Sequence, residues 1–124
     1  MSIDTIIPAL LNSLVANRVW QDATPDDLPR DANGAIEDFI IWTLVGGQDA
    51  EYVEQKMGTH TNARIQLHAV SPSSIRASQL AKDARDRLLA SEYTVGVYGS
   101  PVGTYDAPRK LRGRMQQFGI WYSQ

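Results

Sequence analysis

The spacing of the apolar residues changes abruptly in the middle of the chain, and this change restricts the fold classes open to it. From Arg64 to Val70 polar and apolar residues alternate, which is typical of a β-strand with one buried face. Between Pro72 and Leu89 the apolar residues recur at helical spacing instead. We expect Ser71 to cap this helix and Pro72 to be its first residue. The chain therefore combines strands with helices.

Another helix is expected near the start of the chain, over Thr5–Ala16, where Pro8 is tolerated if it falls in the first turn. Further strands are expected over Phe39–Val45, Val95–Tyr98 and Met115–Tyr122. Because strands joined by short connections favour antiparallel pairing with helices on one face, the predicted fold class is α+β: an antiparallel four-stranded sheet packed against two main helices. The residues expected in its core are Ile6, Leu10, Leu14, Leu67, Leu80, Ala84, Leu88, Phe118 and Ile120.

The segment Phe39–Val45 is β-branched or aromatic on both faces of the expected strand. Such a strand lies at the centre of a sheet, or another chain covers its second face. We therefore include Trp42 among the candidate interface residues. The residues before this strand, from Gln21 to Asn33, form a loop, since Pro25 and Pro29 prevent regular pairing there.

Length and composition set further limits. With 124 residues, of which 43% are hydrophobic and 21% charged, the chain is expected to form one globular domain over residues 1–124. Its net charge of −2 argues against a domain built mainly to grip nucleic-acid phosphates. Without cysteine there is no disulfide framework and no thiolate nucleophile. No apolar run approaches the roughly 20 residues of a membrane helix, so we expect no membrane partner. No signal peptide is recognisable, so we expect the protein to stay in the cytoplasm in which it is made.

No motif for catalysis or for cofactor binding is found. The only histidines, His60 and His68, lack the spacing of a helical metal pair, and His68 is expected to point away from the core. The adjacent carboxylates of Asp26 and Asp27 could bind a hard cation, but between Pro25 and Leu28 they are better explained as turn-forming residues. We therefore expect no enzyme, no cofactor and no metal site, and we expect His60→Ala or His68→Ala to leave function intact.

Charge is unevenly distributed along the chain. One short segment has a net charge of +4 from Arg109, Lys110, Arg112 and Arg114. Another has a net charge of −5 from Asp22, Asp26, Asp27, Asp31, Glu37 and Asp38, with Arg30 among them. Either these segments are plain solvated surface, or they bind a partner or a second copy of the chain. Two features support binding to a partner or a second copy. Gly113 suggests a turn or bulge, which would place the segment at an edge. Lys110, Arg112 and Arg114 are expected to share one side of a strand.

The order of several segments resembles a known family. The segments are Leu14–Asp22, the strand Phe39–Val45, Ala63–Ala69 (Ala-Arg-Ile-Gln-Leu-His-Ala), the helix Ala77–Leu89, Tyr105–Arg112 and Phe118–Tyr122 (Phe-Gly-Ile-Trp-Tyr). Together they resemble the small tail-completion, or tail-terminator, proteins of long-tailed bacteriophages and prophages. The resemblance spans nearly the whole chain.

The resemblance implies an α+β structural protein of the virion neck, made in the bacterial cytoplasm. Such proteins cap the finished tail tube, stop its growth and form the joining surface for the head connector. They act as a ring, usually of six subunits, through which DNA passes as cargo. Their partners are other copies, the tail-tube protein and the neck proteins, and they bring no catalytic residues.

A closed ring requires each subunit to use two different patches. We therefore expect an interface formed by Asp22, Asp26, Asp27, Asp31, Arg109, Lys110, Arg112, Arg114 and Trp42. Two alternatives remain: another neck or head-closure protein of the same virion, and a small hydrolase or nuclease without a recognisable motif.

Overall fold

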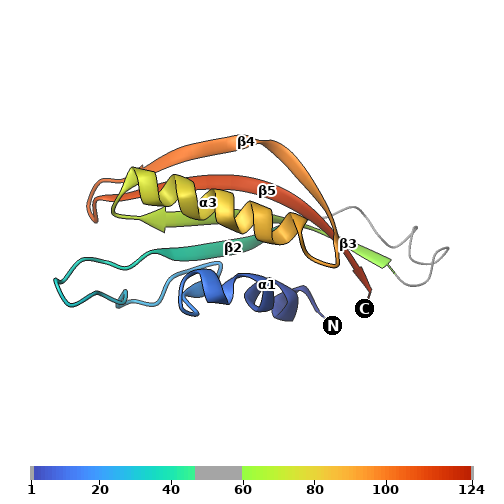
Figure 1. Ribbon diagram of the computed structural model, residues 1–124, viewed down its shortest axis with the longest axis horizontal. Helices are drawn as coiled ribbons and strands as arrows, with labels where there is room; N and C mark the ends of the chain where they lie inside the picture. Colours follow the sequence, from blue (N-terminus) through green and yellow to red (C-terminus); the bar gives the residue numbers. More distant parts are fainter. Residues whose placement is uncertain (1, 47–59, 124) are drawn as a thin grey trace.

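The order of helices and strands largely follows the periodicity of the sequence. The computed structural model describes residues 2–46 and 60–123 (Figure 1). Its elements are α1 (Ile3–Leu11), a 3₁₀ turn η1 (Asn12–Leu14), β1 (Val19–Gln21), β2 (Phe39–Gly46), β3 (His60–Ser71), α3 (Ser74–Leu89), β4 (Thr94–Asp106) and β5 (Leu111–Ser123). None of the helices in these ranges is long and apolar enough to cross a membrane.

The five strands form one sheet in the order β1-β2-β3-β5-β4. All neighbouring pairs are antiparallel except β1 and β2, which run parallel. The α+β class with two main helices is thus confirmed, whereas the expected four-stranded antiparallel sheet is wrong in its details. The additional strand, β1, has only three residues. A strand of that length is too short for its alternation to be visible in the sequence.

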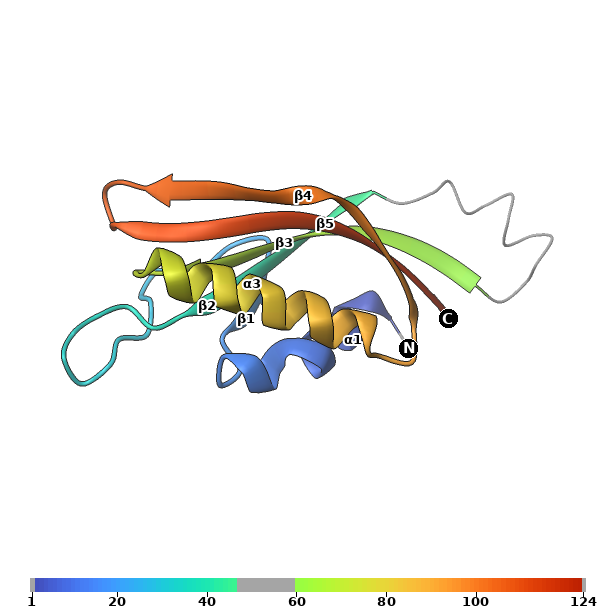
Figure 2. The same cartoon turned by 45° about the horizontal axis from the view of Figure 1, so that its top comes forward.

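Both helices lie on the same face of the sheet (Figures 1 and 2). The main core forms between them and that face, and it includes the buried side chains of Trp42, Ile65 and Phe118. Of the nine expected core residues, seven are buried there, while Leu10 and Leu14 are partly buried and pack against the cluster. The apolar periodicity therefore identified the helix-facing side of the sheet correctly.

The opposite face of β2 is covered by the chain itself. Because β1 and β2 are parallel, the segment between them must cross over, and it passes on the side away from the helices. Leu28 and Ile36 of this crossover pack on Phe39, Val70 and Leu111 in a second apolar cluster. The ring of Trp20 lies 5.4 Å from that of Phe39. No second chain is needed to explain why β2 is apolar on this face.

The ends of the helices differ from the expected ones. The residue that caps α3 is Ser73, whose hydroxyl accepts from the Arg76 N–H at 3.4 Å. Ser71, the expected cap, is instead the buried last residue of β3, and its hydroxyl accepts from the Ser73 N–H at 3.1 Å. At the other helix, α1 begins at Ile3, so Pro8 lies inside it and not in its first turn. The packing of the neighbouring isoleucines in the core compensates for the missing hydrogen bond.

Candidate functional site

The acidic and basic segments lie at the same end of the sheet but on different parts of the molecule. The crossover of residues 22–38, which carries the acidic side chains, begins at the β1 edge and reaches beyond the end of the strands (Figure 1), and its Leu28 and Ile36 pack on the face away from the helices. The turn of residues 107–110 joins β4 to β5 beside the other edge of the sheet. Strand register places Phe39, Val70 and Gly113 in one row, which shows that both segments are at one end.

Some of the acidic side chains are used within the chain. Asp31 accepts from the backbone N–H groups of Asn33 at 2.8 Å and Ala35 at 3.0 Å, so it shapes its own loop. Glu37 and Asp38 form ion pairs of 3.2 Å with Arg18 and 2.9 Å with Arg76. These carboxylates are therefore structural.

Three acidic residues remain for a partner. Asp22, Asp26 and Asp27 are exposed and form no ion pair within the described residues. Asp26 and Asp27 lie between Pro25 and the buried Leu28, which anchors this part of the crossover. Their carboxylates are thus held at the surface by a fixed stretch of backbone.

Of the three basic residues expected to share one side of a strand, Lys110, Arg112 and Arg114, only two do so. Arg109 pairs with Asp106 at 2.8 Å within the turn. Lys110 is exposed in the same turn, with φ at 56°. It therefore does not align with Arg112 and Arg114, contrary to the prediction. Arg112 and Arg114 do share the helix-facing side of β5, where the Arg112 guanidinium lies 4.1 Å from the centre of the Tyr105 ring.

Trp42 does not belong to an interface surface. It is 1% exposed and lies in the main core. The parity of the strand explains the error, because Ile40 and Trp42 face the helices while Phe39 and Ile41 face the crossover. A strand that is apolar on both faces was correctly recognised, but both of its faces are filled by this chain.

Gly113 is not a turn or bulge residue, contrary to expectation. It lies in regular pairing within β5, opposite Val70 and Thr104. A Cβ atom at this position would overlap His68 Nε2 and Thr104 Oγ1, which form a hydrogen bond of 2.8 Å across it. His68 points away from the main core, as predicted, and its partial burial lowers its pKa below 6.5. The side chain of His60 lies outside the described residues.

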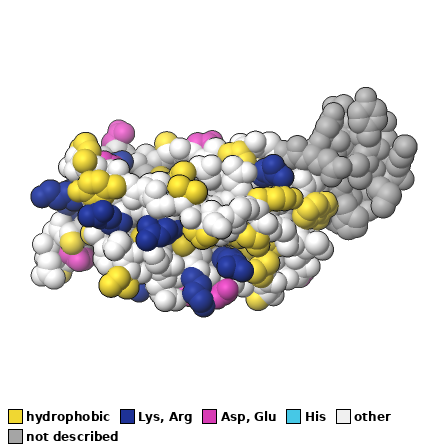
Figure 3. Space-filling model, turned by 90° about the horizontal axis from the view of Figure 1, so that it is seen from above, with side chains coloured by type: hydrophobic (Ala, Val, Ile, Leu, Met, Phe, Trp, Pro, Cys, Tyr) yellow, Lys and Arg dark blue, Asp and Glu magenta, His cyan; other side chains and the backbone are white. Residues whose placement is uncertain are grey.

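The sequence analysis did not identify a basic groove on the helix side of the sheet. It lies between α3 and the β4–β5 hairpin and has a volume of about 440 Å³. Its charged lining residues are Lys82, Arg85 and Asp86 from α3 and Arg114 from β5, and the others are Ser78, Ala81, Pro101 and Gln116. Seen from above the β4 edge, Lys and Arg side chains form a band along this surface (Figure 3). In the sequence, charges along one side of a helix are typical of a solvated face, so they did not reveal the groove.

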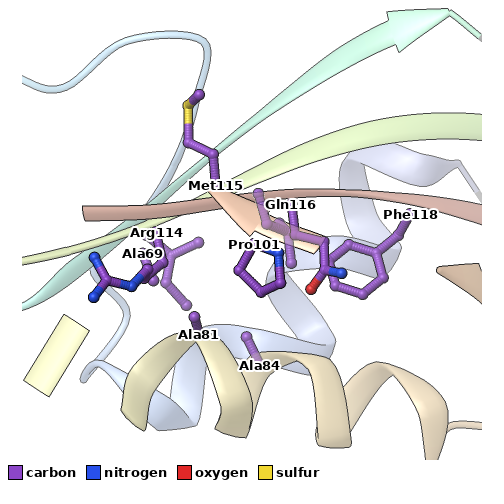
Figure 4. A pocket seen from close by; sticks show the side chains of 10 residues that line it. Ala69, Ala81, Ala84, Pro101, Arg114, Met115, Gln116 and Phe118 are labelled. Carbon is purple, nitrogen blue, oxygen red and sulfur yellow. The ribbon is translucent and has the colours of Figure 1, made fainter. Parts of the chain in front are cut away.

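The floor of the basic groove is apolar. Ala81 and Ala84 of α3 project toward Pro101 and Phe118, while Met115 points to the other side of β5 (Figure 4). The hollow beneath them has a volume of only about 10 Å³, which is about the size of one water molecule. The hollow is too small for a ligand larger than water, and it shares Ala81, Pro101, Arg114 and Gln116 with the lining of the larger groove.

Both edges of the sheet expose apolar side chains. On β2, beyond its pairing with β1, Leu44 is 48% and Val45 41% exposed. On β4, at the opposite edge, Val102 is 58% and Tyr105 51% exposed. Such patches at sheet edges are typical of surfaces that contact another chain.

Comparisons with known proteins give no family for this chain. No family model matches it, and no curated protein matches it. Within residues 2–46 and 60–123, no three His, Asp or Glu side chains are close enough together to hold a metal ion.

Proposed function

We propose that this chain is a structural subunit of a long-tailed bacteriophage virion, which caps the finished tail tube and ends its growth. Copies of the chain join head to tail in a ring, with six subunits as the resemblance implies. The ring then provides the joining surface for the head connector. The chain acts in the neck of the virion, after synthesis in the cytoplasm of the bacterial host, and it catalyses no reaction.

One observation carries this proposal: the free carboxylates and the basic groove are two different patches on one molecule. Asp26 and Asp27 lie on the crossover, on the side away from the helices, while Arg85 and Arg114 lie on the helix side. Two different complementary patches produce head-to-tail contacts, and such contacts close into rings when the rotation between subunits allows it. A two-fold dimer would require one self-complementary patch instead.

The fold and the charge are consistent with this role. The α+β architecture, with two main helices on one face of the sheet, agrees with the fold that the resemblance implies. The net charge of −2 suits a ring through which DNA slides, because a strongly basic surface would hold the phosphates. DNA is therefore cargo in this proposal and not a specific ligand.

A genetic test addresses the proposal. In the phage or prophage that carries the reading frame, disruption should give tails of abnormal length that fail to join heads, and the intact chain supplied in trans should restore them. The neighbouring reading frames should encode the tail-tube and tape-measure proteins. Normal tails in the absence of the chain would contradict tube capping.

The same experiment separates the alternative roles. Tails of normal length that cannot attach to heads would indicate a head-closure protein. Normal tails together with hydrolysis of nucleic acid by the purified chain would indicate an enzyme.

A further inference from the structure

The basic groove carries a charge that the other described residues do not neutralise. Its lining includes three cations and one carboxylate, Asp86. Lys82 pairs with Asp86 at 3.1 Å, which leaves Arg85 and Arg114 as the excess positive charge. Neither guanidinium forms an ion pair with any residue of 2–46 or 60–123. Among the residues that the structure describes, Arg114 Nη1 donates only to the carbonyl of Gly113, at 3.1 Å.

The shape of the groove adds a second constraint. An opening of about 440 Å³ accommodates a few side chains. Its apolar floor of Ala81 and Pro101 and its polar rim with Gln116 suit a short turn of polypeptide that carries carboxylates. Guanidinium groups bind carboxylates well because their planar N–H groups match the two oxygens.

A segment of the required chemistry is present in the chain. Asp26 and Asp27 are adjacent, exposed and free of ion pairs among the described residues. They match the two free guanidinium groups in number and in sign. The buried Leu28 fixes the segment, so little conformational freedom is lost on binding.

We infer that the basic groove of one subunit receives Asp26 and Asp27 of the next. This inference rests on the proposed function, because it specifies the contact that joins the copies. The two surfaces cannot meet within one chain, since Leu28, next to the two carboxylates, packs on the face of the sheet opposite the helices, whereas the groove is lined by α3 and β5. The contact is therefore between copies, with a groove on one side and a loop on the other.

A charge exchange tests the pairing. The groove variant is Arg85→Glu with Arg114→Glu, and the loop variant is Asp26→Lys with Asp27→Lys. Each variant alone should associate at least about tenfold more weakly than the original chain, because like charges then face each other. An equimolar mixture should associate again, since the lysine loop of one variant meets the glutamate groove of the other. Association is measured by sedimentation velocity at about 0.05 M and about 0.5 M salt, and folding by circular dichroism.

A matched control separates the groove from the turn beside it. Arg109→Glu with Lys110→Glu makes the same change in net charge at residues that do not line the groove. This control variant should associate like the original chain. An association defect equal to that of the groove variant would overturn the inference, because it would show that net charge alone matters.

A second measurement retains every charge and does not depend on charge-reversed variants that fold. The chain contains no cysteine, so single cysteines can be cross-linked without background. Ala23→Cys lies near the loop carboxylates, and Ser78→Cys lines the groove. A mixture of these two variants should give cross-linked dimers with a short bifunctional thiol reagent. A mixture of Thr94→Cys and Ser78→Cys should not, because Thr94 lies at the start of β4, at the end of the sheet away from the crossover.

The outcomes distinguish the inference from the proposed function. If the original chain forms rings or caps tubes but neither exchange nor cross-linking succeeds, the loop-to-groove contact is wrong and the proposed function stands. If the chain neither associates nor caps tubes, both are wrong. If the groove variant loses only the binding of a short DNA duplex and assembles normally, the groove is a nucleic-acid site and the inference is overturned.

Discussion

Gly113 leaves space for a hydrogen bond between side chains of the two strands on either side of it. The hydrogen bond between His68 and Thr104 crosses β5 at this position, and only a residue without a Cβ leaves room for it. From the sequence the glycine was predicted to be a turn or bulge, because a glycine within a strand pattern often marks one. The actual cause is in β3 and β4, which are distant in sequence, so local patterns could not reveal it.

Gly113→Ala should therefore destabilise the chain by about 1–3 kcal/mol, the usual cost of overpacking. Gly96→Ala is the matched control, because a Cβ at that strand position would meet only ordinary contacts of 3.6 Å. Urea denaturation monitored by circular dichroism measures both. Equal stabilities of the two variants would show that the space around Gly113 adapts.

His68 should make the stability of the chain depend on pH. Burial lowers the pKa of His68 below 6.5, so the folded state binds its proton less readily than the unfolded state. Above pH 6.5 this contribution to stability is complete, and it is lost as the pH falls through the lowered pKa. His68→Gln should remove this dependence without changing assembly. The measurement is the free energy of unfolding of the original chain and of His68→Gln between about pH 8 and about pH 5. If the two free energies changed with pH in parallel, His68 would not be the cause of the dependence.

At the level of elements, the sequence predicted those with a strong period and missed those without one. The helices and the central strands were recognised because their apolar residues repeat over several turns or pleats. β1 is too short to show a repeat, and β4 continues across Gly99-Ser100-Pro101, beyond the end of the strand predicted for Val95–Tyr98. An edge strand tolerates a proline and a register shift there, because its outer side needs no partner.

The crossover between β1 and β2 has no helix or strand, so its shape depends on a few anchors. Leu28→Ala should cost about 2 kcal/mol of stability, at the low end for a buried leucine, because the second apolar cluster is small. It should also weaken self-association, since the neighbouring carboxylates lose their fixed position. Asp27→Ala should change stability by no more than about 0.5 kcal/mol. Thermal unfolding distinguishes the two, and a negligible effect of Leu28→Ala would show that the crossover is held elsewhere.

At the level of the whole molecule, the distribution of charge matters more than its sum. The sequence revealed that acidic and basic segments are separate, and the basic contact was expected over Arg109–Arg114. In our proposal the contact joins Arg114 of that segment to Arg85, because α3 and β5 bring both side chains into the lining of the basic groove. This pairing depends on how the helix lies on the sheet. The same dependence explains why Trp42 was assigned to an interface and is found in the core.

Reversal of Arg112 and Arg114 to Glu should impair assembly without unfolding the chain, and Asp26→Lys with Asp27→Lys should restore part of it. Most of the loss should come from Arg114, because the Arg112 guanidinium is already stacked on Tyr105. Single-residue reversals compared by sedimentation velocity test this division. The association of the original chain should also weaken as salt is added. A larger effect from Arg112 would place the contact at the hairpin and not in the groove.

Electron microscopy of tail tubes tests the central claim most directly. A tail-tube protein from the same phage or prophage genome, which the proposed function requires, would be polymerised alone and in the presence of the purified chain. The account predicts that the chain binds tube ends as a ring and stops elongation, and that the groove variant with Arg85→Glu and Arg114→Glu does neither. Tubes that continue to grow in the presence of the chain, with no ring at their ends, would contradict it.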